Sequence, residues 1–483
     1  METQAEARGE ERGAHGRWVA ALVAGAFFME NLDGTVITTA IPDMARTFGT
    51  RPTSLSAGIS AYLLTLAVLI PLSGWMADRF GPRNVFATAV AIFTVASVLC
   101  GLSGSLGQFT AARVLQGAGG AMMVPVGRLV VLRTSPKHQL VGAIATLVWP
   151  GLVAPVLGPL VGGLITTWWG WRWIFFLNLP LGAMALVLAL TLIRGHPGEP
   201  RPLDLPGFAL AGIGCSALMY ALEQVGRGST GFPVGALSVG VVALAWGMVH
   251  FRRTPHPLVD LTSWHHRSFV TSQRSGSLFA MAVHSAPFLL PLLFQVGMGR
   301  SAVASGSLLL FLFAGNLSMK TTTTWMLRRF GFRQVLLVNG VLVVVGFVLC
   351  ALLGPATPAW VTGAVLFACG LSRSMQFTAF NTLAFADVPP PRMSAASTLF
   401  SAVGQMSAGF GVALGALALH VAQALGGRLG QRLVTADFHS AFLIMGTLAA
   451  LALIDPLRLP ADAGAQVSGH RPRGTGARST GRM

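Results

Sequence analysis

The stretch MADRFGPRNV, residues 76–85, occurs a second time as MLRRFGFRQV, residues 326–335, and six of the ten positions are identical. Each copy follows the second of six long apolar segments. A second repeated signal, Arg113-x-x-Gln116 and Arg373-x-x-Gln376, lies in the fourth segment of each block. The same signals in the same order indicate a duplicated unit of six segments.

The composition of the chain identifies the apolar segments as membrane spans. Of its 483 residues, 53% are hydrophobic and only 10% are charged, whereas soluble proteins carry about 25% charged residues. Apolar runs of about 20 residues, enough to cross a bilayer, recur from end to end. We therefore expect an all-α polytopic membrane protein. A β-barrel is disfavoured, because its strands would alternate polar and apolar residues over about ten positions.

Fourteen spans are predicted, and twelve of them form the two blocks. Spans 7 and 8 are an inserted pair. The spans lie near residues 18–41, 55–77, 84–103, 106–132, 140–166, 173–193, 206–224, 233–251, 269–295, 303–325, 334–354, 358–381, 395–422 and 439–458. Repeats of this kind, related by an axis along the membrane normal, are typical of transporters with a substrate site between the halves.

The domain organisation follows from these spans. It comprises a cytoplasmic N-terminal tail (1–17), a six-helix bundle (18–197), the inserted helices 7 and 8 with their linkers (198–262), a second six-helix bundle (263–460) and a disordered basic tail (461–483). The first apolar run is too long for a cleavable signal peptide and should remain as the first span.

The net charge of +17 reflects topology and does not indicate a nucleic-acid partner. Most Lys and Arg residues fall in loops on the side of the N-terminus, including Arg79, Arg83, Arg252 and Arg253. Because cytoplasmic loops are enriched in these residues, we expect both termini in the cytoplasm and a location in the bacterial cytoplasmic (inner) membrane. The four cysteines all lie in apolar spans and are interpreted as packing residues, not disulfides or metal ligands.

Five motifs resemble those of the major facilitator superfamily, in its fourteen-span drug:proton antiporter branch. They are Gly74-x-x-Ala77-Asp78-Arg79-x-Gly81-x-Arg83, Arg113-x-x-Gln116-Gly117, Gly158-Pro159-x-x-Gly162-Gly163, Leu32-Asp33-x-Thr35-Val36, and Trp171 to Gly182. The sequence departs from the family pattern at Pro82 and Ala154. The resemblance implies the major facilitator fold, with two six-helix bundles plus two inserted helices.

The resemblance also implies a cytoplasmic gate between spans 2 and 3. Its residues would be Gly74, Asp78, Arg79, Gly81 and Arg83. The two glycines suit a close helix approach and a tight turn, and the charges would lock one state by ion pairs across the bundle. The second repeat has an arginine in place of the acid, so only the first half keeps this gate. A solvated loop is the alternative reading.

In span 5, the antiporter motif consists of Gly158, Pro159, Gly162 and Gly163. Small residues on one helix face allow close helix packing, and prolines allow bending. These properties favour a rocking interface, with simple membrane packing as the alternative.

Proton coupling is predicted for Asp33, Glu30 and Arg113. The two acids are three residues apart, so they share a helix face. Two neighbouring carboxylates cannot both ionise cheaply in a low dielectric, so one is expected to hold a proton. Arg113 would switch this acid by its charge, or it would only tie carbonyl groups together. Glu30 would otherwise be a polar cavity residue.

A substrate cavity is predicted from residues of both halves. Its candidates are Met29, Gln116, His284, Arg373, Gln376 and Phe377. Phe and Met can form an adaptable apolar wall. The alternatives are packing for Met29 and Phe377, a hydrogen-bonded lining role for His284, and a structural tether for Arg373, which could otherwise contact an anionic substrate.

The resemblance implies a proton-coupled antiporter that exports small amphipathic drugs or toxic compounds by alternating access. The alternative is an exporter or importer of one metabolite, such as an amino-acid derivative or a siderophore.

An enzyme is not indicated, because His265-His266 beside Asp260 lacks further ligand spacing. We expect no cofactor and no metal. The expected partners are a small-molecule substrate, protons and lipid, with a monomer as the functional unit. The substrate, the proton stoichiometry and any adaptor protein stay open.

Overall fold

The computed structural model describes residues 2–134, 140–193, 202–225, 232–254, 257, 261–389, 392–427, 433–460 and 463–468. Across these residues every regular element is a helix. Most of the predicted basic tail lies outside the described residues; Ala463 to Ser468 are described and include α19 (Ala465–Ser468).

The first half contains α1 (Glu2–Val36), η1 (Ile37–Thr39), α2 (Ile41–Thr47), η2 (Pro52–Leu55), α3 (Ser56–Leu69), α4 (Leu72–Phe80), α5 (Pro82–Leu102), α6 (Leu106–Thr134), α7 (Leu140–Trp168), α8 (Trp173–Phe176) and α9 (Asn178–Leu192). The inserted pair is α10 (Leu205–Val225) and α11 (Phe232–Arg253). The second half contains η4 (Thr262–His265), α12 (Arg267–Leu292), η5 (Leu293–Gly297), α13 (Ala302–Met319), α14 (Thr323–Ala351), α15 (Ala359–Ala384), α16 (Met393–Leu425), α17 (Thr435–Leu451) and α18 (Ile454–Leu457).

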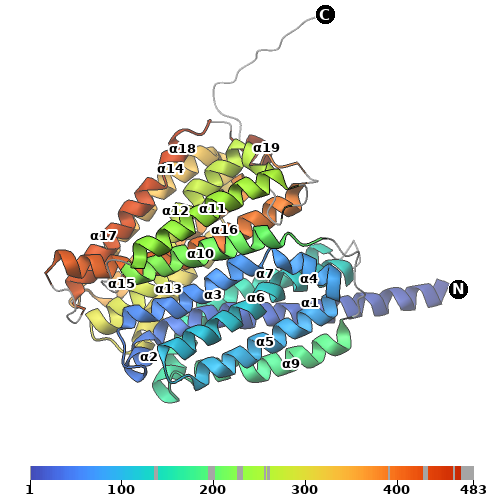
Figure 1. Ribbon diagram of the computed structural model, residues 1–483, viewed down its shortest axis with the longest axis horizontal. Helices are drawn as coiled ribbons and strands as arrows, with labels where there is room; N and C mark the ends of the chain where they lie inside the picture. Colours follow the sequence, from blue (N-terminus) through green and yellow to red (C-terminus); the bar gives the residue numbers. More distant parts are fainter. Residues whose placement is uncertain are drawn as a thin grey trace, which may run out of the picture.

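The predicted membrane architecture is confirmed. Among the described residues, twelve helices are long and apolar enough to cross a membrane. The two other predicted spans coincide with α7, whose apolar part is Val153–Trp168, and with the 26-residue helix α15. Helix α1 begins at Glu2, so the predicted N-terminal tail is helical, and it projects beyond the other helices (Figure 1).

The two halves form two bundles that lie against each other, the first drawn in blue to teal and the second in yellow-green to red (Figure 1). The inserted helices α10 and α11 pack on each other, and α10 also contacts α3 and α16. The insertion therefore covers the place where α3 of the first half meets α16 of the second.

The duplicated sequence builds the same turn twice. Gly81 and Gly331 both have positive φ, +85° and +72°, a backbone conformation that glycine adopts without steric cost. Arg83 donates a hydrogen bond to a carbonyl oxygen of α9, and Arg333 donates one to a carbonyl oxygen of α18 (3.3 Å). The repeat read from the sequence is thus a structural repeat.

The halves pack together at one end of the molecule, which we call the α2 end. Helix α7 packs on α13, and α3 packs on α16. Ser60 Oγ donates to the carbonyl oxygen of Gly409 (3.1 Å), and Gln295 Nε2 donates to that of Thr39 (3.0 Å). These contacts tie the first half directly to the second.

The apolar cores follow the same division. One core cluster contains residues of both halves, and its members in the first half, such as Val36 and Ile41, lie near α2. A second cluster, which includes Phe86 and Val131, belongs to the first half alone and lies toward α4. The halves therefore share a core at the α2 end, whereas the first half has its own core toward the opposite, α4 end.

Candidate functional site

The predicted proton-coupling acid Asp33 forms a buried ion pair with Arg113. Arg113 Nη1 lies 2.6 Å from Asp33 Oδ2, and each side chain is only 1% exposed. Asp33 comes from α1 and Arg113 from α6, so the pair joins two helices that are 80 residues apart in the sequence. A charged pair removed from water this completely requires further hydrogen bonds.

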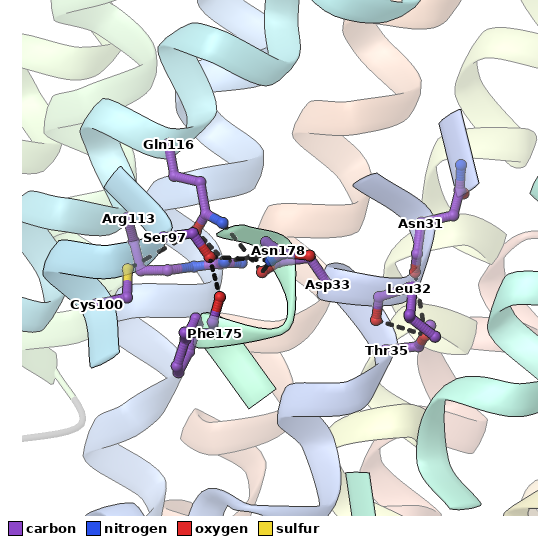
Figure 2. A network of polar contacts seen from close by, with 10 residues as sticks. All are labelled: Asn31, Leu32, Asp33, Thr35, Ser97, Cys100, Arg113, Gln116, Phe175 and Asn178. Carbon is purple, nitrogen blue, oxygen red and sulfur yellow. Dashed lines mark hydrogen bonds and ion pairs between the residues drawn. The ribbon is translucent and has the colours of Figure 1, made fainter. Parts of the chain in front are cut away.

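Two amide side chains complete the surroundings of Asp33 (Figure 2). Gln116 Nε2 and Asn178 Nδ2 both donate to Oδ1, at 3.0 and 2.9 Å. Arg113 Nη1 also donates to Gln116 Oε1 (2.6 Å), and Asn178 Nδ2 also donates to Ser97 Oγ (2.9 Å). The Asp33 carboxylate on α1 therefore accepts three hydrogen bonds from residues of α6 and α9, and Ser97 of α5 joins the network through Asn178.

The second predicted acid, Glu30, is less completely satisfied. It is 9% exposed and accepts a hydrogen bond from the hydroxyl group of Tyr62, but its Oε2 atom has no partner among the described residues. The Arg113 guanidinium lies over the Tyr62 ring, 4.2 Å from its centroid. Tyr62 thus connects Glu30 to the Asp33–Arg113 pair.

The predicted gate residues surround the turn from α4 to α5. Gly81 provides the positive-φ turn that the sequence predicts. Arg79 is exposed, Asp78 is half-buried, and Arg83 contacts α9 of its own half. A side chain at Gly74 would meet no neighbouring atom within 4 Å, so the close helix approach expected at Gly74 is not present in this conformation.

The glycines of the antiporter motif allow α7 to approach two helices closely. A Cβ atom at Gly158 would collide with Thr35 of α1, and one at Gly162 would collide with the carbonyl oxygen of Val36. On the other side, a Cβ atom at Gly163 would lie 2.6 Å from the carbonyl oxygen of Ala302 in α13. The motif therefore places α7 between the helix that carries Asp33 and the second half of the molecule.

The contact between α7 and α13 is reciprocal. A Cβ atom at Gly306 of α13 would collide with the carbonyl oxygen of Pro159, the second residue of the antiporter motif. Close approach of this kind is typical of small residues at helix interfaces in membranes.

The six residues predicted for a substrate cavity separate into different environments. Met29 is 1% exposed and packs in the core of the first half. Gln116 belongs to the Asp33 network. Gln376 accepts a hydrogen bond from Asn339 (2.8 Å) and donates one to the carbonyl oxygen of Leu336 (3.1 Å), so its contacts are structural.

The three remaining residues, His284, Arg373 and Phe377, form a cluster in the second half. The Phe377 ring centroid lies 5.5 Å from that of His284 and 5.8 Å from the Arg373 guanidinium carbon. A ring nitrogen of His284 makes a hydrogen bond with the carbonyl oxygen of Ala280 (2.8 Å). Of the six predicted residues, Arg373 lines a cavity, which is described below.

Four residues of the site were not predicted as site residues: Tyr62, Ser97, Cys100 and Asn178. A signal existed for Tyr62 and Asn178. Tyr62 is one of only two tyrosines in the chain and lies in an apolar span, and Asn178 falls within the motif from Trp171 to Gly182.

In the part of the chain that the structure describes, no three or more His, Cys, Asp or Glu side chains are grouped as a metal site would require. Asp260, which the sequence places near His265 and His266, lies outside the described residues.

The fold and the site together define a two-bundle membrane transporter architecture with a buried ion pair in the first bundle. Residues 23–412 match the family model of the Major Facilitator Superfamily. The chain belongs to this family, as its motifs predicted.

Close relatives support the same assignment. The chain is 36% identical, over 462 residues, to the "Putative multidrug resistance protein MdtD" of Escherichia coli O1:K1 / APEC, covering 92% of this chain and 95% of the relative. The protein of the same name from Shigella flexneri serotype 5b (strain 8401) is 36% identical over 460 residues, with the same coverage.

Solved structures of other members share the fold. The POT family transporter PepTSo has a TM-score of 0.67 at 13% identity and covers 93% of this chain and 99% of its own. A D-xylose-proton symporter has a TM-score of 0.65 at 14% identity and covers 94% and 99%. At these identities the likeness concerns the fold alone.

Proposed function

We propose that this transporter is a proton-coupled antiporter that exports small amphipathic compounds by alternating access. The observation that carries the proposal is the buried Asp33–Arg113 ion pair with Glu30 one turn away on the same helix. Ionisable residues inside a membrane are costly and generally mark ion or substrate pathways. The names of the curated relatives, which refer to multidrug resistance, support the substrate class.

A proton on Asp33 would release three donors at once. Arg113, Gln116 and Asn178 all point to this carboxylate, and protonation removes the negative charge that holds them. The helices α6 and α9 then lose their common acceptor on α1. Protonation therefore changes the packing of α1 against two neighbouring helices.

Of the two acids, Glu30 is the more favourable site for a second proton. Burying a charged oxygen without a hydrogen-bond partner is costly, and Glu30 has such an oxygen whereas Asp33 does not. We assign the exchangeable protons to this pair of acids, with Tyr62 and Arg113 between them.

The antiporter motif supplies a path from the acids to the other half. Gly158 packs on Thr35, two residues after Asp33, and Gly163 packs on Ala302 of α13. A shift of α1 would press on α7, and α7 would press on the second half. This is a contiguous packed route between the proton site and the interface that alternating access must rearrange.

The conformation supports an inward-facing assignment. The halves share a core at the α2 end, and the usual enrichment of Lys and Arg in cytoplasmic loops supports an outer position for that end. In this reading the outer side is closed, and the gate around Gly81 belongs to the cytoplasmic side.

The test is proton flux in proteoliposomes on addition of a panel of amphipathic compounds. We expect Asp33→Asn to abolish compound-evoked proton flux and Glu30→Gln to reduce it. Asp43→Asn is the matched control, because Asp43 lies in α2 and pairs with the exposed Arg46. Undiminished proton flux in Asp33→Asn would remove Asp33 from the mechanism.

A further inference from the structure

The second half carries the counterpart of Arg113 without a counterpart of its acid. Arg373 lies in α15, where the sequence repeats the Arg-x-x-Gln pattern. Its Nε and Nη1 atoms are shielded from solvent and have no hydrogen-bond partner among the described residues. The guanidinium carbon of Arg373 lies 5.8 Å from the centroid of the Phe377 ring. A guanidinium group has five N–H donors and stays protonated in proteins, so this environment leaves its charge uncompensated.

The second half cannot supply the missing acid from its own helices. Between residues 261 and 460 the sequence contains only three acidic residues, Asp387, Asp437 and Asp455. Asp387 follows the end of α15, Asp437 caps the start of α17 through the backbone N–H of Val434 (2.9 Å), and Asp455 lies in the short helix α18. None of them is placed in the middle of a long helix, where Arg373 lies.

Arg373 borders a cavity at the place where the first half has its ion pair. Helices α12, α14, α15 and α17 line it together with Leu312 of α13. In the repeat these four helices correspond to α1, α5, α6 and α9, whose residues form the Asp33 network. Two lining residues, Phe347 and Cys350, stand 250 positions after Ser97 and Cys100, which belong to the Asp33 network. The cavity is therefore the repeat-related equivalent of the buried acid site.

The wall of this cavity is mostly apolar. The space among its lining residues is about 420 Å³ when the solvent at its opening is counted. Aliphatic and aromatic side chains dominate the lining, among them Val283, Leu290, Leu312, Val343, Phe347 and Phe442. Ser372, the polar neighbour of Arg373, uses its hydroxyl group for carbonyl oxygens of its own helix.

We propose that Arg373 binds the carboxylate of an amphipathic organic anion whose apolar part occupies this cavity. The first half neutralises its arginine with Asp33, and the second half neutralises its arginine with the substrate. A carboxylate matches the planar guanidinium fork with two parallel hydrogen bonds, and the apolar lining accepts a hydrocarbon or aromatic body. The inference rests on the proposed function, because it names the class of substrate that the transporter exports.

A small inorganic anion fits the site less well. A buried ion needs several donors to replace its water, and Arg373 is the one lining residue with donors to spare. An amphipathic carboxylate needs only that one arginine, since the rest of the molecule gains from leaving water.

The test is calorimetric binding to the purified full-length protein in detergent. The probes are 2-naphthylacetate and its uncharged amide, 2-naphthylacetamide, with chloride as a competitor. We expect the carboxylate to bind at least tenfold more tightly than the amide. In Arg373→Gln this preference is lost and the affinity for the amide is unchanged, whereas Arg373→Lys keeps part of the preference.

A second variant leaves the arginine in place. Ala286 lines the same cavity from α12, so Ala286→Asp adds an acid to the cavity that Arg373 borders and should abolish the preference for the carboxylate as Arg373→Gln does. Arg392→Gln, at the exposed start of α16, is the matched control and should bind as the unmodified protein does.

The inference is overturned if the unmodified protein binds the acid and the amide equally, if Arg373→Gln and Ala286→Asp keep the preference, or if chloride displaces the carboxylate at equal concentration. The binding assay uses no proton gradient. Equal binding of the two probes, together with proton flux that depends on Asp33, would contradict this inference but not the proposed function. Preferential binding of the carboxylate without proton-coupled flux would contradict the proposed function but not the binding site at Arg373.

Discussion

The two halves of the molecule hold the same arginine in the same helix of the repeat, but they treat its charge differently. Arg113 meets Asp33 at 2.6 Å inside a network of amide donors. Arg373 meets no acid among the described residues and borders an apolar cavity. The duplicated helices therefore bury one arginine against an acid and leave the other beside an apolar cavity, which is the difference on which both proposals rest.

The glutamines that accompany the two arginines sharpen this contrast. Gln116 faces the acid and accepts a hydrogen bond from Arg113. Gln376 turns to Asn339 and to the backbone of α14. In the second half the glutamine therefore stabilises the bundle, and the arginine is left without this partner.

The largest expected effect concerns stability. Breaking a buried ion pair from one side leaves a buried charge and costs about 3–5 kcal/mol, so Asp33→Ala should lower the free energy of unfolding by an amount of this order. Arg373→Gln removes a charge that already lacks a partner and should leave thermal stability unchanged or raise it. Thermal unfolding of the detergent-solubilised protein measures both.

The double variant Asp33→Asn with Arg113→Gln is the control for this prediction. It removes both charges and should be more stable than Asp33→Ala. Equal losses for Asp33→Ala and Arg373→Gln would contradict the distinction between the two arginines.

The next effect concerns the interface between the halves. Gly306→Leu places a branched side chain against the backbone of Pro159, and overpacking of this kind typically costs about 1–3 kcal/mol. We expect a severe loss of transport with the protein still inserted in the membrane. Gly235→Ala, in the inserted helix α11, is the control, because an added methyl group meets no atom there. Equal transport by both variants would argue against α7 and α13 as a moving contact.

The smallest expected effect compares the two positive-φ turns. Gly81→Ala and Gly331→Ala both force a side chain into a left-handed backbone conformation, at a cost of about 1–2 kcal/mol. Because the turns are equivalent in structure, we expect similar losses of stability, measured by thermal unfolding. Transport should fall further in Gly81→Ala if the first turn alone carries the gate. Identical transport in the two variants would argue that neither turn acts as a gate.

The sequence predicted the parts of the molecule that depend on local signals. The repeated stretch at residues 76–85 and 326–335 implied two equivalent turns, and Gly81 and Gly331 form them. The apolar runs predicted the spans, because the length of a run and its hydropathy are sufficient to recognise a helix that crosses a membrane.

The site was predictable only in part, since it depends on how the helices are rotated. Glu30 and Met29 are adjacent in sequence, yet Glu30 turns toward Tyr62 and Met29 enters the core. The ion pair joins residues 80 positions apart, and Asn178 reaches Asp33 across 145 positions. No spacing in the sequence fixes such contacts, because they follow from the packing of α1, α6 and α9.

The most direct test of the account is proton release on binding, recorded in weakly buffered detergent solution with a pH-sensitive dye. Asp33→Asn is predicted to bind an exported amphipathic compound and to release fewer protons than the unmodified protein, while the exposed-acid control Asp43→Asn releases the full amount. Full proton release by Asp33→Asn at saturating compound would contradict the central claim that this acid couples protons to substrate.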